Sequence, residues 1–141
     1  MKTVFFSKEF LNKNIKDHII FICDHATNFI PSNYNNLGIS DENLKSHIAY
    51  DIGAKEVTEH LAKKLGQSYF LSNFSRLLID PNRNINDIDL IKSNSFGIDI
   101  PGNFNIKINE RKKRIDCFYN SYHKNLTNFI KDKLKNFSKV S

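Results

Sequence analysis

Several features that mark secreted proteins, membrane proteins and common enzyme classes are missing from this sequence. Cys23 and Cys117 are the only cysteines, and the absence of a Cys-x-x-Cys spacing is typical of reduced thiols. The apolar patch in the N-terminal MKTVFFSKEF is too short for a secretory signal, and no run approaches the ~20 apolar residues of a membrane helix. A glycine-rich phosphate loop and a serine or cysteine nucleophile elbow are also absent. We therefore expect a soluble, cytoplasmic protein with no membrane partner.

No internal repeat, low-complexity linker or domain boundary interrupts the chain of 141 residues, so we expect a single domain over residues 1–141. The formal net charge of +6 would suit a nucleic-acid-binding protein. Much of the positive charge, however, lies in residues 111–139, in a helical pattern whose other face is apolar. We interpret these residues as the solvated face of a helix and expect no nucleic-acid partner.

Apolar runs predict three strands. Residues 18–23 (HIIFIC) form a continuous, β-branched-rich run, which is typical of a strand that is covered on both faces. Residues 68–72 (SYFLS) and 76–80 (RLLID) predict two further short strands.

Capping residues and periodicity predict two helices. Ser40 is a good N-cap and Gly66 a good residue after a last turn, so one helix is expected between them. Residues 109–137 carry an apolar stripe that predicts the second helix, and residues 100–103 (IPGN) predict a tight turn. The order of strands and helices predicts an α/β fold, a mixed sheet flanked by helices.

The first strand leads directly into polar residues. Asp24 and His25 follow the apolar run, and ligands in open α/β sheets bind outside the carboxyl ends of the strands. Asn28 lies three residues after His25, where a His-x-x-Glu zinc-binding loop would carry glutamate, and asparagine is a weaker, neutral ligand. From spacing alone, a loop-stabilising hydrogen bond is the alternative to a metal-ligating role for His25.

His47 and Asp51 are spaced i, i+4 in the first predicted helix and fall among Leu44 and Ile48 on its apolar face. Buried charges need partners. Two interpretations stay open, a mutually satisfied pair inside the core or a pair that lines a site at the strand ends. In either case we predict both side chains within hydrogen-bond reach of each other or of groups around His25.

Two arginines bracket the third predicted strand. Arg76 precedes it, and Arg83 follows it beside Asp80 and Asn82. The planar fork of arginine suits bidentate contact with a carboxylate. From spacing alone, an Arg83–Asp80 clamp within the turn is the alternative to substrate binding.

Five segments together resemble one known family. They are CDHATNFIP (23–31), HIAYDIGAKEV (47–57), LSNFSRLLIDPNR (71–83), IPGN (100–103) and FYNSYHKNL (118–126). Their order and approximate spacing are similar to those of the N-formylglutamate amidohydrolases, in the branch of predicted N-formylglutamate amidohydrolases. The resemblance extends over nearly the whole chain.

The resemblance implies a fold related to that of the zinc carboxypeptidases, which is also called phosphorylase/hydrolase-like. It implies hydrolysis of N-formyl-L-glutamate to formate and glutamate, a step in histidine breakdown. It also implies a divalent metal, usually taken as zinc, that activates the attacking water. His25 would be one metal ligand, and Asn28 stands where relatives in the wider group have the glutamate of His-x-x-Glu.

The resemblance also implies how the substrate, a small acidic N-acyl amino acid, is held. Residues 80–83 (DPNR) are similar to a stretch of related acylamino-acid hydrolases in which Asn and Arg bind the substrate carboxylate. This points to Asn82 and Arg83, together with Arg76. Asp51 and His47 are our candidate catalytic residues.

Family members continue into a further strand that ends in an HSF-like segment, which is expected to supply another metal ligand. This sequence ends in LKNFSKVS, so we expect an incomplete fold and metal site, weak zinc binding and impaired hydrolysis. Self-association or a second chain would then complete the fold. The alternative function is a non-catalytic binding protein for acidic amino acids or other dicarboxylates.

Overall fold

The structure is a computed structural model that describes residues 3–9, 17–135 and 139–141. Within these residues, no helix has both the length and the apolar character that crossing a lipid bilayer requires. Besides the sheet and the two helices that cover it, the chain forms β2 (Asp17–His18), η1 (Ser32–Gly38), α1 (Asp41–Leu44), η2 (Ile88–Leu90), β5 (Asn94–Ser95), β6 (Ile98–Asp99), η3 (Pro101–Asn103), α3 (Ile108–Arg114), η4 (Ile115–Asn120) and β7 (Lys139–Val140).

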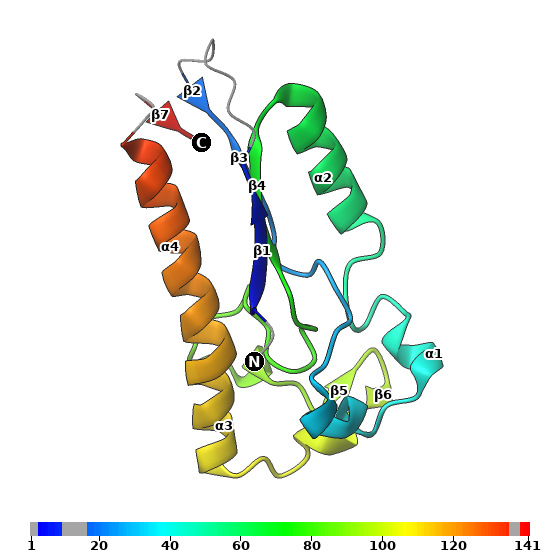
Figure 1. Cartoon of the computed structure of the whole chain (residues 1–141). Coiled ribbons are helices and arrows are strands. Elements are labelled where there is room, and N and C mark those ends of the chain that lie inside the picture. Colours follow the sequence, from blue (N-terminus) through cyan, green and yellow to red (C-terminus); the bar gives the residue numbers. More distant parts are fainter. Residues whose placement is uncertain (1–2, 10–16, 136–138) are drawn as a thin grey trace.

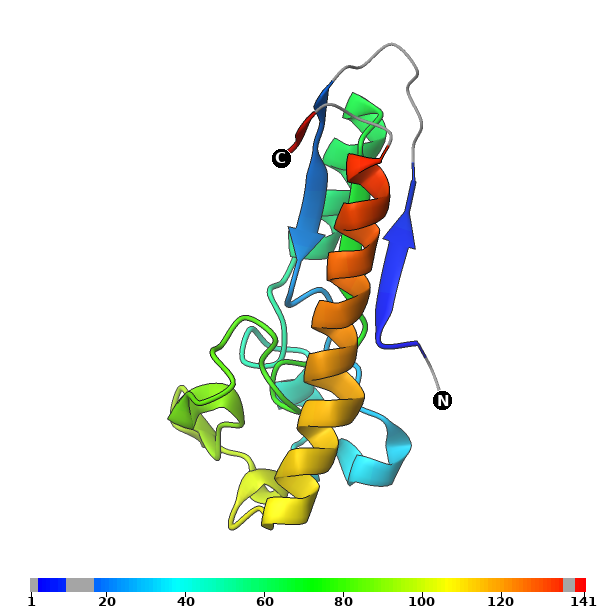
Figure 2. The ribbon, with the colours of Figure 1, turned by 90° about the vertical axis from the view of Figure 1, so that its left-hand side faces the viewer.

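A three-stranded sheet forms the centre, with the strand order β1 (Phe5–Lys8), β4 (Ser68–Ser72), β3 (Ile20–Cys23). β4 runs antiparallel to β1 and parallel to β3, so the sheet is mixed. Figure 1 shows α2 (Ala54–Leu65) on one face of the sheet and α4 (Ser121–Leu134) on the other, and Figure 2 shows α4 in front of the sheet. This layering confirms the predicted α/β fold.

The strand expected at residues 18–23 is present as β2 and β3, which Ile19 separates. β2 pairs in parallel with β7, and β3 pairs with β4. Burial on both faces was wrong for this segment, because Ile19 and Ile22 are 41% and 43% exposed. A continuous apolar run therefore indicated the strand correctly but not its environment.

The single helix predicted between Ser40 and Gly66 is wrong. The two caps are as expected: the Ser40 hydroxyl accepts from the Asn43 N–H, and Gly66 is left-handed at the end of α2. Between them, however, the chain leaves the helix after α1 and re-enters it only at Ala54, after Gly53 with φ +83°.

The break between α1 and α2 is caused by long-range contacts. Ile48 and Ala49 are fully buried in the core, and the Ala49 carbonyl accepts from the Ser75 hydroxyl at 2.8 Å. The Asp51 N–H donates to the His25 carbonyl at 3.0 Å. These backbone groups would be used within the helix if it continued, so tertiary bonding overrides the helical periodicity.

The strand predicted at residues 76–80 is also wrong. Leu77, Leu78 and Ile79 are fully or almost fully buried, as the apolar run suggested, but Leu77 and Leu78 lie in a turn and Ile79 in the loop after it, without strand pairing. Ser75 shapes this turn, because its hydroxyl accepts from the Leu77 N–H and its carbonyl from the Leu78 N–H. A buried loop must have its backbone groups bound. Arg114 therefore donates to the Leu78 carbonyl at 3.1 Å.

The IPGN segment forms the expected tight turn as η3, where the Phe104 N–H donates to the Pro101 carbonyl. A Cβ on Gly102 would lie 2.8 Å from Leu37 Cα, so only glycine allows this approach of the two backbones. Asn103 is buried and donates to the Leu77 carbonyl at 2.8 Å. The turn thereby fixes the loop that follows β4.

The predicted C-terminal helix is present as α3, the π-helical η4 and α4, which follow one another without a break; residues 136–138 lie outside the described residues. The solvated basic face that we predicted needs correction, because Arg114 and Lys133 are 2% and 3% exposed. Arg114 is bound by Glu110 and by the loop carbonyls, and Lys133 pairs with Glu9 at 2.8 Å. Part of the positive charge is thus structural.

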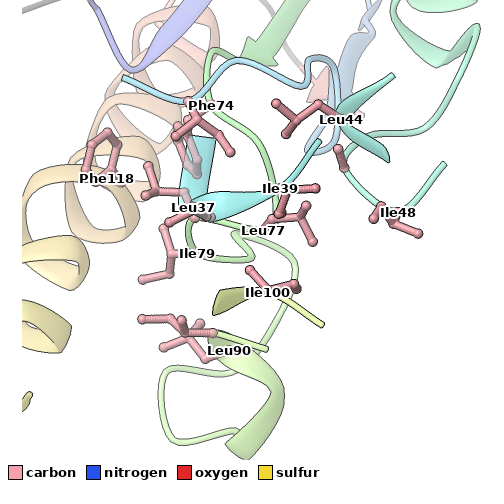
Figure 3. Close-up of a cluster of buried hydrophobic side chains, with 14 of the residues drawn as sticks. Leu37, Ile39, Leu44, Ile48, Phe74, Leu77, Ile79, Leu90, Ile100 and Phe118 are labelled. Atoms are coloured by element: carbon pink, nitrogen blue, oxygen red, sulfur yellow. The ribbon is translucent and has the colours of Figure 1, made fainter. Parts of the chain in front are cut away.

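The main hydrophobic core extends beyond the sheet. Figure 3 shows buried hydrophobic side chains that converge from η1, the loop after β4 and η4. The labelled residues are Leu37, Ile39, Leu44, Ile48, Phe74, Leu77, Ile79, Leu90, Ile100 and Phe118. Most of them come from loops and short helices that follow the carboxyl ends of β3 and β4. Close packing of these loops gives the polar residues among them fixed positions.

Candidate active site

The candidate site lies at the carboxyl ends of two parallel strands. Cys23 at the end of β3 is in register with Leu71 in β4. Asp24 and His25 directly follow β3, and the loop after β4 carries residues 76–83. Because β3 and β4 are parallel, these two loops leave the sheet at the same edge, where α/β proteins bind ligands.

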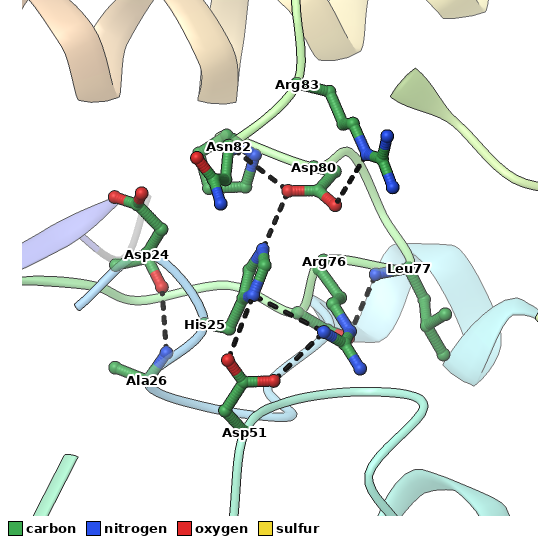
Figure 4. A network of polar contacts seen from close by, with 12 residues as sticks. Asp24, His25, Ala26, Asp51, Arg76, Leu77, Asp80, Asn82 and Arg83 are labelled. Atoms are coloured by element: carbon green, nitrogen blue, oxygen red, sulfur yellow. Dashed lines mark hydrogen bonds and ion pairs between the residues drawn. The ribbon is translucent and has the colours of Figure 1, made fainter. Parts of the chain in front are cut away.

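His25 and Asp80 form the central pair (Figure 4). His25 Nε2 donates to Asp80 Oδ1 at 2.7 Å, and both side chains are 11% exposed. The Asn82 N–H donates to the same carboxylate oxygen at 2.9 Å. The turn at Asn82 thus orients the Asp80 carboxylate, which in turn holds the buried His25 imidazole in one ring orientation.

The two groups perturb each other's pKa. Burial lowers the pKa of His25, but the hydrogen bond and charge of Asp80, with the charge of Asp51, outweigh it and raise the pKa above its ordinary value. Burial raises the pKa of Asp80, but the hydrogen bond and charge of His25 outweigh it and lower that pKa. The fold therefore favours an imidazolium beside a carboxylate.

Asp51 reaches this pair from the segment between α1 and α2. Its Oδ2 lies 3.3 Å from His25 Nδ1, and its Oδ1 accepts from Arg76 Nη1 at 3.0 Å (Figure 4). The predicted contact of Asp51 with the surroundings of His25 is therefore confirmed. The predicted setting is wrong, because Asp51 lies outside any helix and its side chain is 52% exposed.

His47 does not join Asp51. Its side chain is exposed, and its ring makes an edge-to-face contact with Phe96, with the ring centroids 4.8 Å apart. Because the helix ends at Leu44, the i, i+4 relation that was expected to align His47 with Asp51 does not exist. His47 contributes its main-chain carbonyl instead, which accepts from Arg76 Nη2.

All three nitrogens of the Arg76 guanidinium contact protein groups. Nε donates to the Ile48 carbonyl at 2.9 Å, Nη2 to the His47 carbonyl and Nη1 to Asp51, and Nη1 also lies 3.4 Å from His25 Nδ1. This geometry favours a positioning role for Arg76, which joins the segment after α1 to the central pair. Its predicted contact with substrate stays a prediction.

Arg83 is held less tightly. Its Nε lies 3.8 Å from Asp80 Oδ2 and its Nη1 3.7 Å from Asp87 Oδ2, both longer than a hydrogen bond, and its side chain is 41% exposed. The Arg83–Asp80 clamp that spacing suggested is thus present but loose. More donors of Arg83 than of Arg76 are therefore left for a ligand.

Asn28 lies away from these groups. Its amide nitrogen donates to the Leu44 carbonyl at 2.9 Å, which ties the loop after β3 to the end of α1. The structure brings His25 together with Asp80 and Asp51, and Asn28 does not line the cavity around them. The metal-ligating role of Asn28 stays a prediction, with only its amide oxygen left to fulfil it.

A cavity of about 350 Å³ opens on the central pair. It is lined by His25, Ile48, Arg76, Leu77, Asp80, Asn82, Arg83, Asp89, Lys92, Ser95 and Phe96. A larger cavity of about 480 Å³ lies elsewhere, between residues 29–36 and the end of α3, and no histidine, aspartate or glutamate lines it. We therefore assign the chemistry to the smaller cavity.

Three polar side chains of the C-terminal helical segment support the site, and the sequence pattern did not reveal them. The buried Tyr122 donates from its hydroxyl to Asp24 Oδ1 at 2.5 Å, and burial, together with Asp24, raises the pKa of Tyr122. Tyr119 donates to the Arg83 carbonyl at 2.8 Å, and His123 Nε2 to the Pro81 carbonyl at 3.0 Å. The apolar stripe indicated only packing, whereas these three polar tips bind the loops that carry the site.

A catalytic zinc ion needs about three protein ligands and one open position. Both ring nitrogens of His25 face a carboxylate, whereas a metal-ligating imidazole leaves one deprotonated nitrogen for the ion. In the described residues, no group of three His, Cys, Asp or Glu side chains could hold a metal ion. These residues therefore do not fit a three-ligand zinc site by themselves, and zinc dependence stays a prediction.

Known proteins share this fold. A crystal structure of a gene product from Agrobacterium tumefaciens has a TM-score of 0.86 and 30% identity to this chain, which it covers to 96%. The crystal structure of N-formylglutamate amidohydrolase from Ralstonia eutropha JMP134 has a TM-score of 0.70 and 21% identity over 98% of this chain. This chain spans about half the length of these two proteins, 52% of the first and 54% of the second. No curated protein matches the chain.

The family comparison covers the strands and loops that build the site. Residues 17–141 match the family described as N-formylglutamate amidohydrolase, and this range includes β3, β4 and every residue of the 350 Å³ cavity. The chain belongs to the N-formylglutamate amidohydrolase family.

Proposed function

We propose that this chain takes part in the hydrolysis of N-formyl-L-glutamate to formate and L-glutamate, in the cytoplasm, as a step of histidine breakdown. The observation that carries the proposal is the buried His25–Asp80 pair, which opens on a cavity of about 350 Å³ that also contains Arg83. Membership of the amidohydrolase family supports the reaction class. The solved relative from Ralstonia eutropha, which is named N-formylglutamate amidohydrolase, supports the choice of substrate.

Arg83 is our candidate for binding the α-carboxylate of the substrate. Its guanidinium lines the cavity and is only loosely paired, so a carboxylate could replace the distant contacts with Asp80 and Asp87. A planar guanidinium forms two parallel hydrogen bonds with a carboxylate. Asn82, next to it on the cavity wall, would orient the same group.

His25 is our candidate for the proton transfer that hydrolysis requires. The oxygen of water adds to the formyl carbon and releases a proton to the solvent. The carbon–nitrogen bond then breaks, formate leaves, and the nitrogen of the leaving amine takes up a proton. Since Asp80 and Asp51 favour the imidazolium form of His25, this ring can hold a proton next to the cavity and give it to that nitrogen. Asp51, whose Oδ2 lies 3.3 Å from His25 Nδ1, would stabilise the imidazolium before this transfer. We propose no part for the His47 side chain.

A divalent metal, most simply zinc, would supply Lewis acidity and lower the pKa of a bound water. His25, Asp51 and Asp80 are the candidate donors in this chain, but their present contacts leave no group of three that faces one ion. We therefore expect weak zinc binding by the isolated chain and route no step of the reaction through a metal. Completion of the site by self-association or by a second chain is part of the proposal.

The test combines calorimetry with a formate-release assay on the purified chain. Wild type should bind N-formyl-L-glutamate, and Arg83→Ala should bind it about 10–150-fold more weakly because a charged hydrogen bond is lost. The control is Arg111→Ala, which removes an arginine that does not line the cavity. Unchanged binding by Arg83→Ala would leave Arg83 as a clamp on Asp80 alone.

A second function is favoured by the absence of three suitable donors in the described residues. The chain would then bind acidic amino acids or other dicarboxylates without hydrolysing them. Ligand binding without formate release, at any added zinc concentration, would support this function. Formate release that His25→Asn abolishes would support the amidohydrolase, and absence of ligand binding would contradict both.

A further inference from the structure

The positively charged groups that line the cavity differ in how far the protein already uses them. His25 is hydrogen-bonded to Asp80 at 2.7 Å, and Arg76 donates to Asp51 and to two main-chain carbonyls. Two cations remain, Arg83 and Lys92. Lys92 Nζ lies 3.6 Å from Asp89 Oδ2, which is an ion pair too long for a good hydrogen bond. Lys92 can therefore exchange this contact for one with a ligand.

Lys92 is attached to a rigid wall. Its carbonyl accepts from Asn103 Nδ2 at 2.6 Å, and the same amide nitrogen donates to the Leu77 carbonyl at 2.8 Å. Arg114 in turn donates to Asn103 Oδ1 at 2.6 Å, and both of these side chains are buried. The Lys92 backbone is thus fixed relative to Leu77, another residue of the cavity wall, while its amine can adjust.

We propose that Lys92 binds the side-chain carboxylate of the substrate and so makes the site selective for N-acyl derivatives of acidic amino acids. The inference rests on the proposed function, in which Arg83 takes the α-carboxylate. A ligand with two carboxylates then meets two separate cations across one cavity. The apolar side chains of Ile48 and Leu77, which also line it, can contact the methylene groups between them.

Asp89 sets how strongly Lys92 can act. It lines the same cavity and competes with the ligand carboxylate for the ammonium group. Neutralising Asp89 removes both the competitor and a like charge beside the incoming carboxylate. The proposal therefore predicts opposite changes in the affinity for a dicarboxylate from Lys92→Met and Asp89→Asn, two substitutions in one ion pair.

The experiment measures the dissociation constants of N-formyl-L-glutamate and N-formyl-L-glutamine by titration calorimetry. The second ligand has the same shape but a neutral side-chain amide. Wild type should prefer the glutamate derivative, and Lys92→Met should weaken its binding by about 5–30-fold while changing the glutamine derivative less than twofold. Asp89→Asn should tighten binding of the glutamate derivative. Lys131→Met, an exposed lysine on α4 that does not line the cavity, is the control for the lost charge.

The outcomes separate this inference from the proposed function. A preference for the glutamate derivative that Lys92→Met removes and Lys131→Met retains supports the role of Lys92. A preference that survives Lys92→Met overturns it, and so does wild-type binding of both ligands with equal affinity, although the proposed function stands in either case. Absence of binding of either ligand by the folded wild type overturns both.

Discussion

Asp80→Asn tests the central pair most directly. Asparagine keeps an oxygen that can accept from His25 Nε2, so the substitution removes the charge and leaves the hydrogen bond. A charged hydrogen bond contributes about 1.5–3 kcal/mol and a neutral one about 0.5–1.5 kcal/mol, so the free energy of unfolding should fall by about 1–2 kcal/mol. For a domain of this size, the melting temperature should fall by about 3–8 °C.

The loss of stability should depend on pH. The pKa of His25 is raised in the folded chain, so its contribution is full below the unfolded value of about 6.5 and is lost as pH rises through the folded pKa. The pKa of Asp80 is lowered, so its contribution is present above about pH 4 and is lost as pH falls through the folded pKa. The destabilisation by Asp80→Asn should therefore be larger at about pH 5.5 than at about pH 8.5.

Two measurements check this prediction. Thermal unfolding at both pH values gives the difference in stability, and NMR titration of the His25 ring protons should show a pKa that falls in Asp80→Asn. Asp132→Asn is the matched control, because Asp132 is an exposed aspartate on α4 that pairs with Lys135. Equal destabilisation at the two pH values, or an unchanged pKa of His25, would refute the pair as the source of the stability.

Two further predictions concern the supports of the site. Arg76→Lys retains the charge but loses the planar guanidinium that joins Asp51 to two carbonyls, so chemical denaturation should show that the free energy of unfolding falls by about 2–4 kcal/mol. A fall below about 0.5 kcal/mol would contradict the positioning role of Arg76. Tyr122→Phe removes the donor to Asp24 and should cost about 1–2 kcal/mol, with the same cost at pH 6 and pH 9 because the raised pKa keeps the phenol protonated across that range. A cost that changes over this interval would show that the phenol ionises there.

The sequence predicted those features that depend on neighbouring residues. Ser40 and Gly66 act as caps because the hydrogen bonds and the left-handed backbone that they provide involve residues within four positions of them. Asp24 and His25 were correctly expected at the carboxyl end of a strand, because the carboxyl-end rule does not require knowledge of side-chain contacts.

The errors arose where distant residues decide the structure. Nothing near His47 reveals that Arg76 will bind its carbonyl and Ser75 that of Ala49, and these contacts replace the helix. The His25–Asp80 bond joins residues 55 positions apart, and the turn bond from the Asn82 N–H sets its direction. Spacing suggested Arg83 as the partner of Asp80, yet a buried histidine at 2.7 Å is the stronger one.

The π-helical segment η4 has a consequence for which changes in chain length the protein can tolerate. A π-turn holds one more residue than an α-turn, so deleting a single residue from Ile115–Asn120 would restore regular α-helix there. It would also rotate α3 relative to α4 by about 100°. Arg114 on one side and Tyr122 on the other could then no longer both reach the loops they bind. Single-residue deletions in η4 should therefore be far more damaging than substitutions at its exposed positions, such as Asp116 and Asn120.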